Sequence, residues 1–243
     1  MSTQTGNVFV GNIAKQRLNI ILLVDTSSSM RGTRIEQVND AIFEIKDYLS
    51  KMEDENTNVD FYITLITYST QASFYKDEKC LPVKKFGFQG IKAAGRSNIH
   101  LAYKFLSEIL KKESQGGIMP DFGGLAPIIL LMSDGHPSNG AIKTELSSLQ
   151  KLPWFKIALK YGISVGSNDE KTIRCLNDFV SGNGDVIECY DARLLNRIIK
   201  IIVITASKVK SSSSSVKGKK PSQTEEIKGL VQQAIAEVDD WEW

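Results

Sequence analysis

The sequence has little of what redox, zinc and membrane proteins are usually built from. Only three cysteines and two histidines occur in 243 residues, and no two cysteines form a C-x-x-C pair. A cysteine-based zinc site and a disulfide framework are therefore excluded, and we interpret the cysteines as small buried hydrophobic residues. The longest late apolar stretch, 194–206, is interrupted by Arg197 and Lys200. It is shorter than the roughly 20 apolar residues that a membrane-spanning helix needs, so no membrane segment is expected.

An excess of charge of one sign is also missing. The chain carries 30 Lys and Arg against 28 Asp and Glu, a net charge of +2, so no global basic field favours binding to nucleic acid. The first residues lack a basic segment followed by an apolar one and a small-residue cleavage site. No secretory signal is indicated, and we expect a cytoplasmic protein. Glycine-rich nucleotide-binding signatures are absent after the first apolar run, which argues against a nucleotide site.

What is present is an alternation of apolar runs and amphipathic stretches. The runs at 18–24 and 127–133 are continuous, which is typical of strands buried on both faces. Further strands are expected at 59–68, near 157–165 and at 186–190, with a short edge strand at 71–75. Helices are expected at 35–49, at 99–110 closed by Gly116-Gly117, near 141–152, near 171–180 and from 192 to about 208. This alternation predicts an α/β fold: a doubly wound, mostly parallel central sheet with helices on both faces and one short antiparallel edge strand.

The composition changes at residue 208, where five lysines and many serines occur without a single acid up to residue 220. We predict an N-terminal extension at 1–16, a globular domain at 17–207, a flexible linker at 208–223 and a short amphipathic acidic helix and tail at 224–243. The last five residues are predicted to form a docking peptide, because Trp is enriched at binding hot spots: Asp239, Asp240, Trp241, Glu242 and Trp243. A tail packed back on its own domain is the alternative.

Three polar segments lie where two buried strands end and where a helix begins. Residues 25–29 read D-T-S-S-S, residues 95–97 read G-R-S, and residues 133–135 read S-D-G. In a doubly wound sheet the ligand site lies at the carboxyl ends of the strands, where Asp25 and Asp134 stand. Hard divalent cations take oxygen ligands, and two hydroxyls two residues apart on a tight loop can face one ion. The pattern therefore predicts a metal site.

In this order the segments resemble the metal-ion-dependent adhesion site (MIDAS) of von Willebrand factor A domains, which have a Rossmann-like fold. The resemblance implies that Ser27 and Ser29 are direct ligands and that Asp25 and Asp134 hold the ion through waters. Ser97 stands where the family has Thr, and it lacks the methyl group that restricts χ1, so this ligand is expected to be looser. Mg²⁺, Mn²⁺ and Ca²⁺ all accept oxygen ligands, and the sequence does not choose among them.

The resemblance further implies a non-catalytic protein interaction module, in which an acidic residue of a partner completes the metal coordination. Arg96 and His136 lie beside the site and are candidate partner contacts. The acidic tail is a second candidate ligand, for its own site or for a neighbouring copy, which would give self-association. Within the family, residues 133–139 and the serine-rich C-terminus look most like the TerY-type tellurite-resistance proteins. That likeness implies an adaptor in a bacterial stress and defence cluster, with a PP2C-like phosphatase and a Ser/Thr kinase-like protein as partners.

Two alternatives remain open at this stage. A metal-independent scaffold with a vestigial site is favoured by the change from Thr to Ser97. A Mg²⁺-dependent phosphohydrolase of the haloacid-dehalogenase type also begins with an aspartate at a strand end. That chemistry needs a second carboxylate two positions later, where this chain has Ser27.

Overall fold

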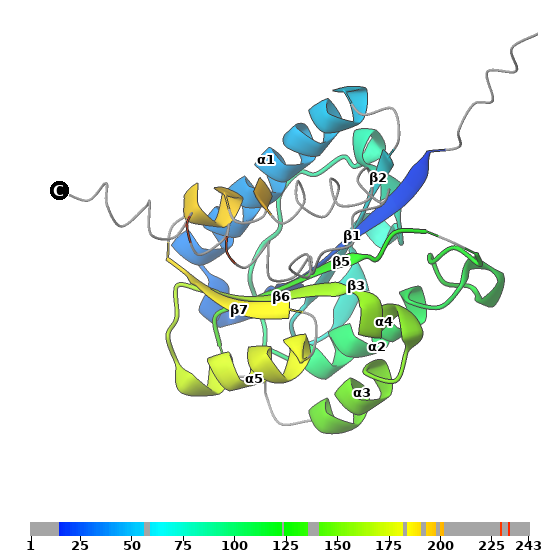
Figure 1. The fold of residues 1–243 in the computed structure, drawn as a ribbon. Helices are drawn as coiled ribbons and strands as arrows, with labels where there is room; N and C mark the ends of the chain where they lie inside the picture. The colour runs from blue at the N-terminus through cyan, green and yellow to red at the C-terminus, as the bar shows by residue number, and fades with distance from the viewer. Residues whose placement is uncertain are drawn as a thin grey trace, which may run out of the picture.

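One central sheet organises the chain (Figure 1). The structure is a computed structural model that describes residues 15–55, 59–122, 124–135, 141–181, 184–190, 193–197, 200–201, 229 and 233. The strand order is β3-β2-β1-β5-β6-β7, with β4 also paired to β2. The strands are β1 Gln16–Asp25, β2 Val59–Tyr68, β3 Ala72–Phe74, β4 Leu81–Pro82, β5 Ile128–Ser133, β6 Leu159–Val165 and β7 Gly184–Cys189.

The long strands are parallel, and β3 and β4 run antiparallel to β2. The predicted doubly wound α/β sheet with a short antiparallel edge strand is thus confirmed. Strand β4 was not predicted, because two residues are too few to show a period.

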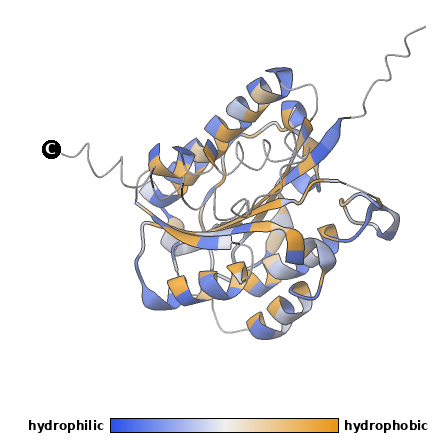
Figure 2. Cartoon of the chain, in the orientation of Figure 1, coloured by the Kyte–Doolittle hydropathy of each residue, from blue (hydrophilic) through white to orange (hydrophobic). Residues whose placement is uncertain are grey.

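Helices cover both faces of the sheet. Helix α1, Thr33–Glu55, lies on one face, and the other is covered by α2 Ile99–Ile109, α3 Ile142–Leu149, α4 Pro153–Ile157 and α5 Glu170–Val180 (Figure 1). Alternate residues of β1 point to opposite faces of the sheet. Leu22 and Val24 pack in the hydrophobic core between the sheet and α1, and Ile21 and Leu23 pack in the core between the sheet and α2 to α5. Figure 2 shows the hydrophobic sides of these helices facing the sheet.

Two predicted helices are found within three residues of their expected bounds. The helix predicted at 99–110 spans Ile99–Ile109, but Gly116-Gly117 does not close it. A separate 3₁₀ turn, Glu113–Gln115, lies between them, and Gly116 after that turn has a positive φ of 81°. The helix expected near 141–152 is confirmed as α3, Ile142–Leu149, and a further short helix that was not predicted, α4, begins at Pro153.

The C-terminal predictions are mostly beyond the described part of the chain. Residues 193–197 and 200–201 are helical, as are 229 and 233, and the rest of the predicted helix, linker and tail lies outside the described residues. Among the described helices, none combines the length and the apolar character that crossing a bilayer requires.

The direction of the strand order reverses between β1 and β5. Strand β1 leads to β2 on one side and pairs with β5 on the other, with Val24 beside Met132. The carboxyl ends of these two strands are therefore adjacent. Asp25 ends β1 and Asp134 directly follows β5, so the fold brings the two aspartates of the sequence analysis to the position where doubly wound sheets bind ligands.

Candidate metal centre

Asp25 forms the deep side of the candidate site. Its side chain is buried at the end of β1, and three donors orient the carboxylate. The Ser27 amide donates to Oδ1 over 2.8 Å, and the hydroxyls of Ser97 and Ser133 donate to Oδ2 over 2.7 and 2.9 Å. Burial raises the pKa of Asp25, and the hydrogen bonds from Ser27, Ser97 and Ser133 oppose that rise only in part.

Two further hydroxyls link this carboxylate region to the second aspartate. The Ser27 and Ser29 hydroxyl oxygens are 3.0 Å apart, and the Ser29 hydroxyl donates to Asp134 Oδ1 over 2.8 Å. Ser27 and Asp134 are buried, whereas Ser29 is exposed. The site is therefore lined by buried oxygen atoms and opens to solvent on the side of Ser29.

The loop that carries Ser97 is held against the first loop by backbone hydrogen bonds. The Ser28 amide donates to the Gly95 carbonyl over 2.9 Å, and the Gly95 amide donates to the Ser28 hydroxyl over 3.1 Å. Gly95 has a φ of +90°, and a Cβ there would lie 2.5 Å from the Thr70 hydroxyl. Only glycine fits this position without strain, and its conformation delivers Ser97 to Asp25.

The atoms present suit a hard cation. In an octahedron with metal–oxygen distances of about 2.1 Å, neighbouring ligands lie about 3.0 Å apart, which matches the spacing of Ser27 and Ser29. Within the described ranges, no three His, Cys, Asp or Glu side chains gather as a metal-binding group. A metal site here would thus be rich in hydroxyls: Ser27, Ser29 and Ser97 would hold the ion, and Asp25 and Asp134 would balance its charge.

The structure brings together all five predicted metal-site residues: Asp25, Ser27, Ser29, Ser97 and Asp134. Of the predicted partner contacts, Arg96 is exposed beside the site, whereas His136 and residues 239–243 lie outside the described part of the chain.

Two residues were missed by sequence reasoning. Ser133 ends β5 and its hydroxyl donates to Asp25. Arg34, in the first turn of α1, places a guanidinium nitrogen 2.6 Å from Asp134 Oδ2. Ser133 could have been found from the sequence, because it lies at the predicted end of a buried strand beside Asp134, which is a predicted site residue. Nothing in the sequence pairs residue 34 with residue 134, since only the sheet order brings them together.

The fold and this site define a class of protein: an α/β domain with a hydroxyl-rich cation site at the switch point of its sheet. Residues 19–184 match the von Willebrand factor type A domain family, and the chain belongs to that family. Domains of this family commonly act as protein–protein interaction modules through a MIDAS.

Several curated proteins are similar in sequence over about half of the chain. Inter-alpha-trypsin inhibitor heavy chain H4 of Bos taurus is 30% identical over 140 residues, which are 55% of this chain and 14% of that protein. Heavy chain H2 of Mesocricetus auratus is 32% identical over 134 residues, 55% of this chain and 13% of that protein. The matched region is thus a small part of each of these relatives.

Solved structures share the fold at low sequence identity. Proximal thread matrix protein 1 from the mussel byssus, in a form with a zinc-occupied MIDAS motif, has a TM-score of 0.56 at 19% identity, covering 79% of this chain and 48% of that chain. The von Willebrand factor domain of the pilus tip protein Mfa5 from Porphyromonas gingivalis has a TM-score of 0.53 at 12% identity, covering 84% and 99%.

Proposed function

We propose that this protein is a non-catalytic, divalent-metal-dependent interaction module that binds an acidic side chain of another protein. The observation that carries the proposal is the convergence of three hydroxyls and two carboxylates at one solvent-facing point of the sheet edge. A divalent ion bound there supplies a Lewis-acidic position for a carboxylate. The chain itself provides mostly neutral hydroxyl ligands, which leave that position positively charged.

The surface around the site supports an acidic partner. Arg31, Lys92 and Arg96 are exposed on the two loops that flank Ser29, and the Arg31 side chain donates to the Ala93 carbonyl. None of these three cations forms an ion pair with any described residue. An acidic segment that reaches the ion from this side gains attraction from all three.

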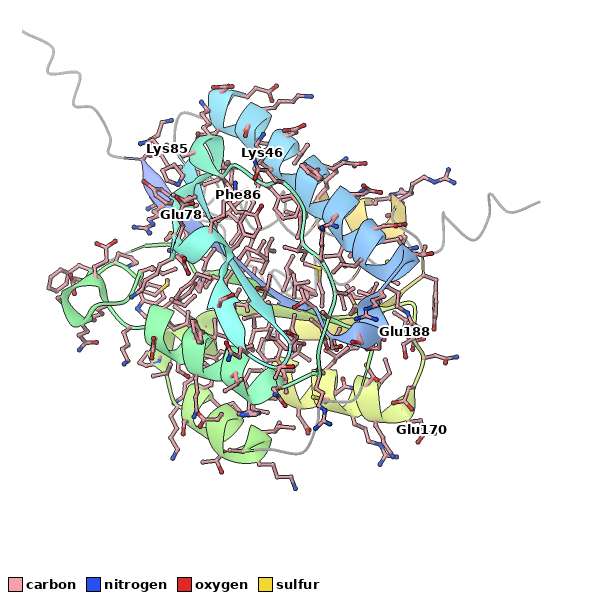
Figure 3. All side chains as sticks on the ribbon, turned by 180° about the vertical axis from the view of Figure 1, so that it is seen from behind. Lys46, Glu78, Lys85, Phe86, Glu170 and Glu188 are labelled. Carbon is pink, nitrogen blue, oxygen red and sulfur yellow. The ribbon has the colours of Figure 1, made fainter. Side chains whose placement is uncertain are left out.

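Two acidic side chains at this end of the molecule have partners of their own. Glu170, which begins α5, and Glu188, near the end of β7, lie at the same end of the molecule as the candidate site (Figure 3). Glu170 forms an ion pair with Arg174 over 3.1 Å, and Glu188 accepts a hydrogen bond from the Tyr190 hydroxyl over 2.9 Å. The ion pair with Arg174 weakens the repulsion that Glu170 exerts on an acidic segment.

The geometry of Asp25 supports binding rather than phosphoryl transfer. A nucleophilic aspartate needs a free oxygen and a nearby acid or base, whereas both Asp25 oxygens accept hydrogen bonds and Ser27 occupies the position of the second carboxylate. A metal-independent scaffold is the alternative that the experiment below addresses.

We extend the proposal to a cytoplasmic adaptor of the TerY type that works with a PP2C-like phosphatase and a Ser/Thr kinase-like protein. Its support is the sequence of residues 133–139 and the serine-rich segment after residue 208. The metal ion is Mg²⁺ or Mn²⁺ in this proposal, with Ca²⁺ as the further candidate.

The test is affinity capture from the native host with wild type, Ser27→Ala and a surface control, Ser148→Ala, each in Mn²⁺ and in EDTA. Ser148 lies on α3, and its hydroxyl donates to the carbonyl of Thr144 in the same helix. We expect phosphatase-like or kinase-like proteins to be retained by wild type and the control only with metal, and to be lost with Ser27→Ala. Capture that persists in EDTA and with Ser27→Ala contradicts the proposal and supports a metal-independent scaffold.

A further inference from the structure

Arg34 is the one positively charged side chain that contacts a metal-site carboxylate among the described residues. Its Nη1 donates to Asp134 Oδ2 over 2.6 Å and to the Ser29 carbonyl over 3.1 Å, and its Nη2 donates to the Gly166 carbonyl over 2.9 Å. The Asp134 side chain has no exposed surface, whereas 37% of the Arg34 side chain is exposed. One guanidinium thus joins the first loop, the carboxylate after β5 and the loop after β6.

In the loop after β6, a glycine leaves space for the Arg34 side chain. Gly166 has a φ of +61°, and a Cβ on it would lie 3.1 Å from Arg34 Nε. The Gly166 amide also donates to the Cys189 carbonyl at the end of β7, which holds the loop in place. Arg34 is therefore held by hydrogen bonds to the first loop and to the loop after β6.

The charge of Arg34 changes the electrostatic balance of the site. The two carboxylates, Asp25 and Asp134, together balance one divalent ion, and the guanidinium adds one positive charge that no other contacting group offsets. An arginine next to the ion repels it, because like charges in a partly buried site interact more strongly than in water. The same extra charge attracts an anionic group that approaches the loaded site.

We propose that Arg34 sets the site to bind its metal less tightly and an incoming carboxylate more tightly than the other ligands alone would. Arg34 is thus a residue that determines specificity for an anionic partner group. The inference rests on the proposed function, because it assumes that a divalent ion and a carboxylate meet at this site.

The experiment compares wild type with Arg34→Gln, using Mn²⁺ as the metal probe and acetate as the carboxylate probe. Mn²⁺ affinity is measured by electron paramagnetic resonance of the free ion. Acetate binding is measured by the fall in water-proton relaxation as acetate displaces water from protein-bound Mn²⁺. We expect Arg34→Gln to bind Mn²⁺ about tenfold more tightly and acetate about tenfold more weakly.

Two controls separate charge from position. Arg34→Lys keeps the charge and should change both constants by less than Arg34→Gln does. Arg174→Gln removes an exposed charge on α5 whose ion pair is with Glu170 and not with a metal-site carboxylate, so its effect on both constants should be small. Weaker binding of both probes by Arg34→Gln, or no change in either, overturns the inference. No Mn²⁺ binding by correctly folded wild type contradicts the proposed function itself, which keeps the two failures distinguishable.

Discussion

At the scale of single residues, Ser97 stands where the resemblance to the family implies a threonine. The Ser97 hydroxyl donates a 2.7 Å hydrogen bond to Asp25. A small pocket lies beside it, lined by Ile99, Ser133, Gly135, Thr172, Cys175 and Leu176. The hydroxyl is thus present, but its χ1 angle is held by one hydrogen bond and not by a branched Cβ.

Restoring the branched residue should tighten the site. We expect Ser97→Thr to raise Mn²⁺ affinity about two- to threefold, because the extra methyl removes χ1 states that the serine must give up on binding. Mn²⁺ titration measures the effect. Ser97→Ala, which removes the hydroxyl, is the matched control and should lower the affinity at least about tenfold. Threonine binding no better than serine would show that the serine is already held in its binding rotamer.

At the scale of elements, Lys160 joins a strand to a helix at the amino-terminal end of the sheet, away from the site. It is the second residue of β6, and only 1% of its surface is exposed. Its Nζ donates to the carbonyls of Phe155 and Ala158, at the end of α4, over 3.0 and 3.2 Å. A cation near the carboxyl end of a helix is favourable, and burial opposes it. Burial lowers the pKa of Lys160 to about 8.

This pKa predicts a pH dependence of stability with a defined sign. Between about pH 8 and pH 10.5 the unfolded chain keeps a proton on Lys160 that the folded chain has lost, so stability rises with pH in this window. We expect the free energy of unfolding of wild type, relative to Lys160→Met, to increase by about 1–3 kcal/mol across it. Urea denaturation at several pH values measures this. A difference that stays constant from pH 7 to pH 10.5 would contradict the lowered pKa.

At the scale of the whole molecule, charge is distributed unevenly between the domain and its C-terminal segment. Residues 221–243 contain six acids and one lysine, and the loops around the candidate site carry three cations that have no ion pair with any described residue. This complementarity makes the acidic end of the chain a candidate ligand for the site, in the same molecule or in a second copy.

Deletion of residues 224–243 tests this relation. We expect the deletion either to abolish metal-dependent self-association or, where the tail binds its own domain, to raise the affinity of Mn²⁺-loaded protein for acetate. Sedimentation velocity in Mn²⁺ and in EDTA measures the first effect, and water-proton relaxation measures the second. Full-length protein with Asp239→Asn, Asp240→Asn and Glu242→Gln is the matched control and should behave like the deletion. The tail is not a ligand of the site if neither quantity changes.

Much of the fold and of the candidate site could be predicted from local patterns. Continuous apolar runs mark β1 and β5, because strands buried on both faces exclude polar residues, and their ends mark the two aspartates. Helix α4 was not predicted, because its five residues, which begin at Pro153, are too few to show a helical period. The short β4 could not be predicted, because its pairing to β2 depends on the neighbouring strand and not on its own two residues.

The sequence by itself determined the alternation of strands and helices, and the hydroxyl and carboxylate groups that make a cation site conceivable. These are local properties, because they depend on the chemistry of each side chain and on the spacing of apolar residues along helices and strands. Only the tertiary structure decided that β1 lies between β2 and β5, which places Arg34 against Asp134 and Ser133 against Asp25. Contacts between residues about 100 positions apart depend on sheet order, and sheet order results from packing over the whole domain.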